Sequence, residues 1–197
     1  HVLRCFEDDD ITHVEGSVDP VRDAQTVETE LMLADMESLS KRMTGLEKRA
    51  KGGDGEAKTL LPLAARALEA LEAGSPARAV SLSAEEQGPF RLLQLITSKP
   101  MLYVANVAES DAAAGNQHSR AVEDYAKAQG TQAVRISAAI EAELSQLPGE
   151  ARQDFLESLG LQEPGLNRLI RAGYGLLGLA TYFTVGPKEA RAWTIPA

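Results

Sequence analysis

An asparagine and a glutamate follow a short apolar segment in the middle of the chain. Pro100 precedes the apolar residues 101–105, and Asn106 and Glu109 come directly after them. Such a segment is typical of a buried strand in a parallel sheet, although a buried piece of helix has the same pattern. Open α/β sheets bind ligands beyond the carboxyl ends of their strands. Because a carboxamide donates and accepts hydrogen bonds and a carboxylate accepts them, this pair could read the edge of a nucleobase.

A second segment strengthens this interpretation. Residues 132–136 predict another strand, which ends in Ser137 and Ala138 about thirty positions after Asn106. In GTPase-like domains the loop at this place presents backbone amides and a small residue to the base, since a bulky side chain would collide with it. The alternative for Asn106 and Glu109, a turn followed by a surface glutamate, stays open on spacing alone.

Composition limits the classes of protein to consider. The 197 residues carry 29 acidic and 20 basic side chains, a net charge of −9, so we expect no general DNA-binding surface. Cys5 is the single cysteine, which excludes an internal disulfide and a cysteine-based zinc site, and the three histidines lack metal-ligand spacing. No apolar run reaches 18 residues. We therefore expect one or two cytoplasmic domains with no metal site and no membrane contact.

Glycine and proline residues divide the chain into expected elements. Asp19 and Pro20 predict the start of a long helix that runs to about residue 50, because Asp caps free amides and Pro fits the first turn. Residues 52–55 interrupt it, and a second helix is expected over 56–73, giving an antiparallel helical hairpin. The apolar stripe expected on the first helix consists of Val27, Leu31, Ala34, Leu39, Met43 and Leu46.

The remaining elements alternate between helix and strand. A short strand is expected at residues 2–6, and Ser83 with Glu86 forms a capping-box pattern that predicts a helix to Leu95. Further helices are expected over 116–129, 139–147, 148–159 and 166–177, and strands over 181–185 and 190–195. This order is typical of an α/β nucleotide-binding domain with a helical insertion.

Several runs resemble the YchF subfamily of Obg-like P-loop ATPases. They are residues 4–8 (RCFED), 11–16 (ITHVEG), 19–23 (DPVRD), 28–31 (ETEL), 99–109 (KPMLYVANVAE), 168–174 (RLIRAGY) and 181–189 (TYFTVGPKE). The resemblance implies a partial P-loop NTPase (G-domain) sheet with an inserted hairpin and the first strands of a TGS domain. The implied boundaries are 1–19 for the first part of the G-domain, 20–82 for the hairpin, 83–178 for the base-binding half and 179–197 for the start of the TGS domain.

The resemblance also implies an activity and partners. Members of this subfamily hydrolyse ATP in preference to GTP and associate with ribosomes, so ATP, Mg²⁺ and ribosomal RNA are the expected cofactors and partners. Asn106 would read the base, Glu109 would have a weaker role, and Ser137 and Ala138 would line the base. Val107 would pack against the ring or offer it a backbone group.

The chain departs from the subfamily in one large respect. No G-x-x-x-x-G-K-[ST] phosphate loop occurs in the sequence, so no catalytic residue is assigned and hydrolysis by this chain alone is not expected. The first residue is His1 rather than Met, and we expect the phosphate loop and the Mg²⁺ ligands upstream of it.

A non-catalytic module that binds the ribosome or RNA is the second hypothesis. Cations gather near the expected hairpin tip, where they could contact phosphates or merely form a solvated helix end; they are Lys41, Arg42, Lys48, Arg49 and Lys51.

Overall fold

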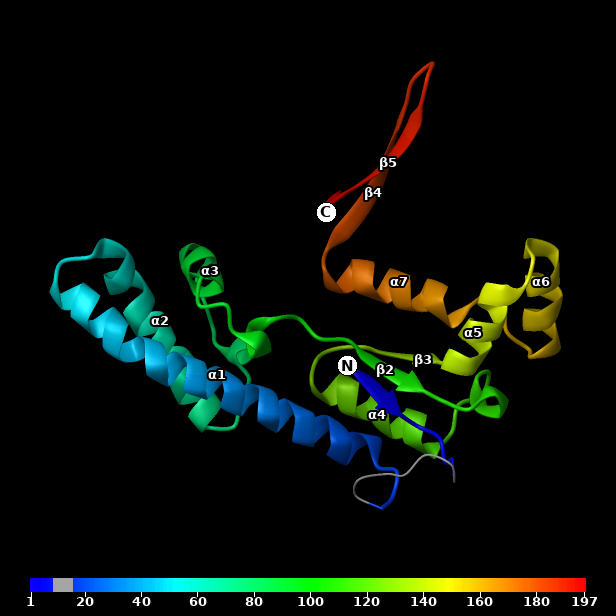
Figure 1. Ribbon diagram of the computed structural model, residues 1–197, viewed down its shortest axis with the longest axis horizontal. Coiled ribbons are helices and arrows are strands. Elements are labelled where there is room, and N and C mark those ends of the chain that lie inside the picture. Colours follow the sequence, from blue (N-terminus) through cyan, green and yellow to red (C-terminus); the bar gives the residue numbers. More distant parts are fainter. Residues whose placement is uncertain (9–15) are drawn as a thin grey trace. The chain divides into compact units, whose positions relative to one another are not determined.

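The computed structural model describes residues 1–8 and 16–197 and divides into two compact units (Figure 1). One unit contains residues 1–24 and 101–197, and the other contains residues 25–100. Most of the ITHVEG run and part of the acidic stretch before it lie outside the described residues.

Three parallel strands form the sheet of the first unit, in the order β1 (Val2–Arg4), β2 (Tyr103–Asn106) and β3 (Ala133–Ile136). In register, Leu3 faces Ala105, which in turn faces Arg135. The expected buried parallel strand before Asn106 is therefore confirmed. Because all three strands run the same way, the segments that follow Arg4, Asn106 and Ile136 leave the same edge of the sheet.

Helices pack against both faces of this sheet (Figure 1). On one face, α4 (Gln117–Ala128) places Val122 and Ala126 in a core with Tyr103 and Ala105. On the other face, α7 (Gly165–Leu176) approaches β3 so closely that a Cβ on Gly165 would lie 2.9 Å from Cγ2 of Ile136. Between them in sequence, α5 (Ala138–Gln146) and α6 (Gly149–Ser158) share a small separate core.

The helical hairpin consists of α1 (Pro20–Lys51) and α2 (Gly55–Glu72), which run side by side (Figure 1). Asp19 accepts a hydrogen bond from the Arg22 amide at the start of α1, as its capping role predicts. Leu39 and Leu46 of α1 share a core with Leu60 and Leu63 of α2. Both predicted helices are confirmed.

The expected stripe on α1 is wrong at Ala34. Ala34 is exposed, whereas its neighbour Asp35 is buried on the face that Leu39 continues. The cause is a polar contact: the Asp35 carboxylate accepts hydrogen bonds from the Ile96 and Thr97 amides, both at 2.8 Å, and from Thr97 Oγ1 at 2.6 Å. A pattern of apolar residues cannot reveal a buried carboxylate.

A short helix, α3 (Ala84–Arg91), follows α2, with one-turn 3₁₀ helices at η1 (Ala77–Ala79) and η2 (Ile96–Ser98). The predicted capping box is present, but α3 ends at Arg91 rather than at Leu95. Successive i→i−3 bonds tighten the chain there, and Gln94 adopts a left-handed φ of 54°. Phe90 packs in the hairpin core, so this unit extends past residue 82; the domain boundaries stay a prediction.

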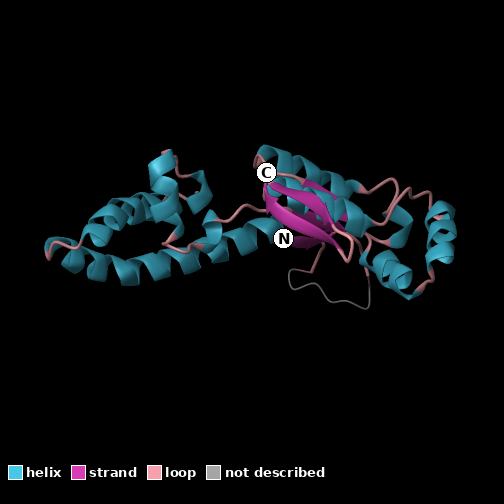
Figure 2. Ribbon diagram, turned by 90° about the horizontal axis from the view of Figure 1, so that it is seen from above, coloured by secondary structure: helices cyan, strands magenta, loops and turns pink. Residues whose placement is uncertain are grey.

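The chain ends in an antiparallel pair, β4 (Leu179–Val185) and β5 (Ala190–Pro196), as the sequence predicts (Figure 1); Figure 2 shows the strands in magenta. The Gly186 amide donates to the Glu189 carbonyl at 2.9 Å and closes the turn. Assignment of this pair to a TGS domain stays a prediction. Among the described residues, no helix has the length and apolar character that crossing a membrane requires.

Candidate nucleotide-base site

Asn106 is held from two sides at the carboxyl edge of the sheet. Its backbone carbonyl accepts a hydrogen bond from the Cys5 amide at 2.7 Å. Its side-chain Oδ1 accepts one from the Ala138 amide, at the start of α5, at 2.9 Å. The structure thus brings together the two loops that were expected to form the site, the one after β2 and the one after β3.

Two polar groups of these loops have no hydrogen-bond partner among the described residues. The first is the Nδ2 amino group of Asn106, whose Oδ1 is directed to α5. The second is the Ser137 hydroxyl, in a residue only 3% exposed. Ser137 occupies the N-cap position of α5, yet its hydroxyl does not cap the helix. Buried polar groups are nearly always paired, so the unpaired Ser137 hydroxyl at a strand end indicates a place for a ligand, whereas the Asn106 amino group is partly exposed.

The other predicted base-site residues differ in their surroundings. Val107 is 2% exposed, its side chain packs in the sheet core, and its amide donates to the Ile136 carbonyl at 2.9 Å. Contact between its side chain and a base is therefore disfavoured, and a backbone role stays a prediction. Glu109 is exposed in the one-turn helix η3 (Glu109–Asp111), and Ala138 is exposed at the start of α5. Their contacts with a base stay predictions.

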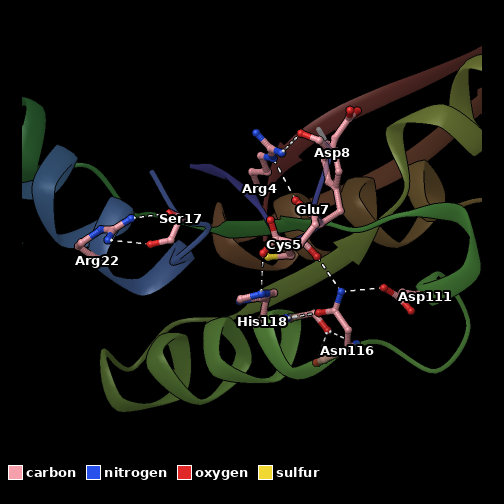
Figure 3. Close-up of polar contacts among 11 residues, drawn as sticks. Arg4, Cys5, Glu7, Asp8, Ser17, Arg22, Asp111, Asn116 and His118 are labelled. Carbon is pink, nitrogen blue, oxygen red and sulfur yellow. Dashed lines mark hydrogen bonds and ion pairs between the residues drawn. The ribbon is translucent and has the colours of Figure 1, made fainter. Parts of the chain in front are cut away.

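Asn116 is a residue of this edge that the sequence did not single out (Figure 3). Its Oδ1 caps α4 by accepting from the Ser119 amide at 2.9 Å. Its Nδ2 donates to the Cys5 carbonyl at 2.7 Å and to Oδ2 of Asp111 at 2.8 Å. The spacing Asn116-x-x-Ser119 could have predicted the cap, but nothing in the sequence points to the two longer links.

The segment after β1 is fixed by polar contacts as well (Figure 3). Arg4 donates to the carbonyls of Phe6 at 3.0 Å and of Asp8 at 3.1 Å, and His118 lies 3.7 Å from the Glu7 carboxylate. Burial, with a smaller contribution from the Glu123 charge, raises the pKa of the Cys5 thiol to about 12. Cys5 is thus a packed neutral thiol, in agreement with its position in the sheet core.

Comparison with known proteins shows the family of the chain. No family model matches the chain. It is 48% identical over 196 residues to the "Ribosome-binding ATPase YchF" of Bacillus subtilis strain 168, covering 98% of this chain and 54% of the relative. It is 47% identical to the protein of the same name from Escherichia coli O157:H7, covering 100% of this chain and 54% of the relative. The chain belongs to the YchF family.

A solved YchF structure has the same fold. The "Structure of the Schizosaccharomyces pombe YchF GTPase" matches with a TM-score of 0.84 and 30% identity, over 98% of this chain and 53% of that one. The α/β fold class is therefore confirmed. The chain spans about half the length of the YchF relatives it matches. The bacterial relatives are named as ATPases and the Schizosaccharomyces pombe protein as a GTPase, so the names leave the choice between adenine and guanine open.

The cations near the hairpin tip are less available than their sequence spacing indicated. Lys41 pairs with Glu37 at 2.5 Å, and Arg42 donates to the Leu93 carbonyl at 2.6 Å. Arg49 contacts Asp54 at 2.7 Å and Glu56 at 2.8 Å, and these contacts raise its pKa. Of the five predicted RNA contacts, Lys48 and Lys51 are the exposed ones that lack a partner within the described residues.

Within residues 1–8 and 16–197, no group of three histidine, cysteine or acidic side chains is arranged to hold a metal ion. We assign no chemical step to Mg²⁺ here.

Proposed function

We propose that this chain forms the base-reading half of a YchF-type nucleotide-binding ATPase that prefers ATP to GTP and associates with ribosomes. The observation that carries the proposal is the double clamp on Asn106, which directs Oδ1 to α5 and leaves Nδ2 without a partner among the described residues. The family names of the relatives support the nucleotide and the ribosome as partners.

The free donor of Asn106 suits a purine. Adenine and guanine both present N7 as an acceptor, so a hydrogen bond from Nδ2 to N7 would favour purines without separating the two. The bases differ at the neighbouring position, where adenine has an N6 amino donor and guanine has an O6 acceptor. A carboxylate at that position accepts from N6 and repels O6, which gives Glu109 its proposed role in the preference for ATP.

Phosphoryl transfer needs groups that hold the phosphates and stabilise their charge, chiefly by position and electrostatics. The sequence has no phosphate loop, and among the described residues no three histidine, cysteine or acidic side chains gather to hold a metal ion. The proposed contribution of this chain is therefore selection of the base, and hydrolysis in the complete protein would depend on other residues.

Substitution of Asn106 in the full-length protein tests the proposal. We expect Asn106→Ala to weaken ATP binding about tenfold, the factor that corresponds to about 1.4 kcal/mol for a lost hydrogen bond. GTP binding should weaken too, because N7 is common to both purines, whereas tripolyphosphate binding should not change. Asn167→Ala, which removes an exposed amide from α7, is the matched control. Unchanged ATP affinity in Asn106→Ala would show the assignment to be wrong.

A second candidate function, a non-catalytic ribosome- or RNA-binding module, is favoured by the two unpaired lysines at the hairpin tip. If they contact phosphates, the double variant Lys48→Glu/Lys51→Glu should reduce ribosome co-sedimentation and lower its log–log salt slope by about 1 to 2. Lys127→Glu, an exposed charge reversal on α4, is the control. Intact co-sedimentation with an unchanged slope in the double variant would exclude the tip as the contact.

A further inference from the structure

We propose that Asn116 is a positioning residue for base selection, because its side chain ties the end of β1 to the loop that carries Glu109. This inference rests on the proposed function. In this inference Asn116 does not touch the base. It determines where the Glu109 carboxylate, which distinguishes adenine from guanine, lies.

The side-chain amino group of Asn116 donates two hydrogen bonds (Figure 3). One is donated to the Cys5 carbonyl, 111 positions earlier in the chain, and the other to the Asp111 carboxylate. A hydrogen bond to a carboxylate is stronger than one between neutral groups. The Asn116 side-chain amide thus links the end of β1 to the turn that contains Asp111.

Cys5 connects this link to the base reader. Its amide donates to the Asn106 carbonyl, and its carbonyl accepts from Asn116. The residue is fully buried. The backbone of Cys5, directly after β1, therefore contacts both Asn106, at the start of the loop, and Asn116, at its end.

The loop between these two points is held mainly by local hydrogen bonds. The Asp111 amide donates to the Ala108 carbonyl at 3.0 Å, and the Gly115 amide donates to the Asp111 carbonyl at 2.7 Å. Glu109 is exposed within this turn. Because Asp111 belongs to the same turn of η3 as Glu109, a link that fixes Asp111 also fixes the backbone from which Glu109 reaches the base.

Removal of the link should therefore change selectivity more than affinity. The distinction between N6 of adenine and O6 of guanine depends on where one carboxylate lies, whereas contacts with N7 and with phosphates do not. A displaced η3 turn would weaken the favourable contact with adenine and relieve the repulsion of guanine.

Two variants separate this link from the helix cap. Asn116→Ser keeps a side-chain oxygen that can cap α4 but removes the amino group. Ser119→Ala keeps the side-chain amino group of Asn116. It removes the Ser119 hydroxyl, which accepts a hydrogen bond from the backbone N–H of Asn116 at 3.0 Å. We expect Asn116→Ser to lower the ratio of ATP to GTP affinity about fivefold, or about 1 kcal/mol, with tripolyphosphate affinity and kcat at saturating ATP unchanged. Ser119→Ala should lower the Tm and leave the ratio unchanged.

The outcomes distinguish this inference from the proposed function. If the unaltered protein has no preference for ATP, the proposed function fails and this inference fails with it. If Asn106→Ala weakens ATP binding but Asn116→Ser leaves the ratio unchanged, or weakens both nucleotides equally, the positioning role alone is wrong. Should Asn116→Ser fail to fold, Asp111→Ala decides, since it removes one of the two bonds and should lower the same ratio by a smaller factor.

Discussion

Two polar centres, one in each compact unit, differ in how completely their hydrogen bonds are made. In the hairpin unit, Asp35 is 2% exposed and accepts three hydrogen bonds from Ile96 and Thr97. Thr97 Oγ1 accepts in turn from the Ala77 amide at 3.1 Å. At the sheet edge, by contrast, Asn106 Nδ2 and the Ser137 hydroxyl have no partner among the described residues.

The difference separates a structural role from a binding role. A buried carboxylate costs free energy unless its oxygens are paired, and Asp35 meets that cost by joining α1, η1 and η2. An unpaired hydroxyl in a buried residue lowers stability, because it has lost its hydrogen bonds to water and gains none within the protein. Ser137 is therefore a group whose partner we expect on a ligand, next to the partly exposed Asn106 amino group, and the predictions below test this division.

Asp35→Ala should have the largest effect on stability. The substitution leaves two backbone amides and one hydroxyl without their acceptor, so we expect the free energy of unfolding of the hairpin unit to fall by about 3 kcal/mol or more. Urea unfolding followed by circular dichroism measures it. Glu30→Ala, which removes an exposed carboxylate from the same helix, should change it little. A small effect of Asp35→Ala would remove the contrast between the two centres.

Gly115→Ala should have the next largest effect, at the sheet edge. Gly115 has a φ of +72°, and a Cβ there would lie 1.8 Å from Nη1 of Arg135 and 2.8 Å from Oγ of Ser119. We expect a loss of about 2 kcal/mol from backbone strain and displaced side chains, measured by urea unfolding. Gly130→Ala is a matched control, because Gly130 has a φ of +69° and open space around it. Equal losses in the two variants would show that the Arg135 contact adds nothing.

The sequence predicted the elements well because their signals are local. Apolar runs, capping residues such as Asp19 and Ser83, and glycines at turns determine where helices and strands begin and end. Each of the predicted strands and long helices is present within the described residues. The convergence of Asn106 with Ser137 and Ala138 was also predictable, since parallel strands end at one edge.

Contacts between distant segments could not be predicted in this way. The link from Asn116 to Cys5 spans 111 positions, and that from Asp35 to Thr97 spans 62. Asp35 lies inside α1, where a periodic pattern predicts that a charged residue is exposed, and Asn116 lies just before α4 as its N-cap. The hydrogen bond from Arg42 to the Leu93 carbonyl could not be predicted for the same reason, since it spans 51 positions.

Ser137→Ala tests the other half of the comparison. The hydroxyl has no partner in the described structure, so its removal should leave the free energy of unfolding unchanged or raise it by up to about 1 kcal/mol. Because we expect the hydroxyl to contact the nucleotide, ATP affinity should fall several-fold in the same variant, as titration calorimetry would show. A clear loss of stability would mean that Ser137 has a structural partner after all, which would place it with Asp35.

The pH dependence contributed by Cys5 should be the smallest effect. Its native pKa of about 12 is above the unfolded value of about 8.5, so the native state holds the thiol proton more tightly. This contribution is fully present below about pH 8.5 and is lost as the pH rises toward the native value, and by pH 9 the loss is about 1 kcal/mol. We expect urea unfolding under reducing conditions to show this decline between pH 7 and 9 in the unaltered protein. Cys5→Ala should be less stable at both pH values and lack the decline. The same slope in both proteins would indicate that the thiol is accessible to water, and that the β1 end is less tightly closed than the bonds to Asn106 and Asn116 imply.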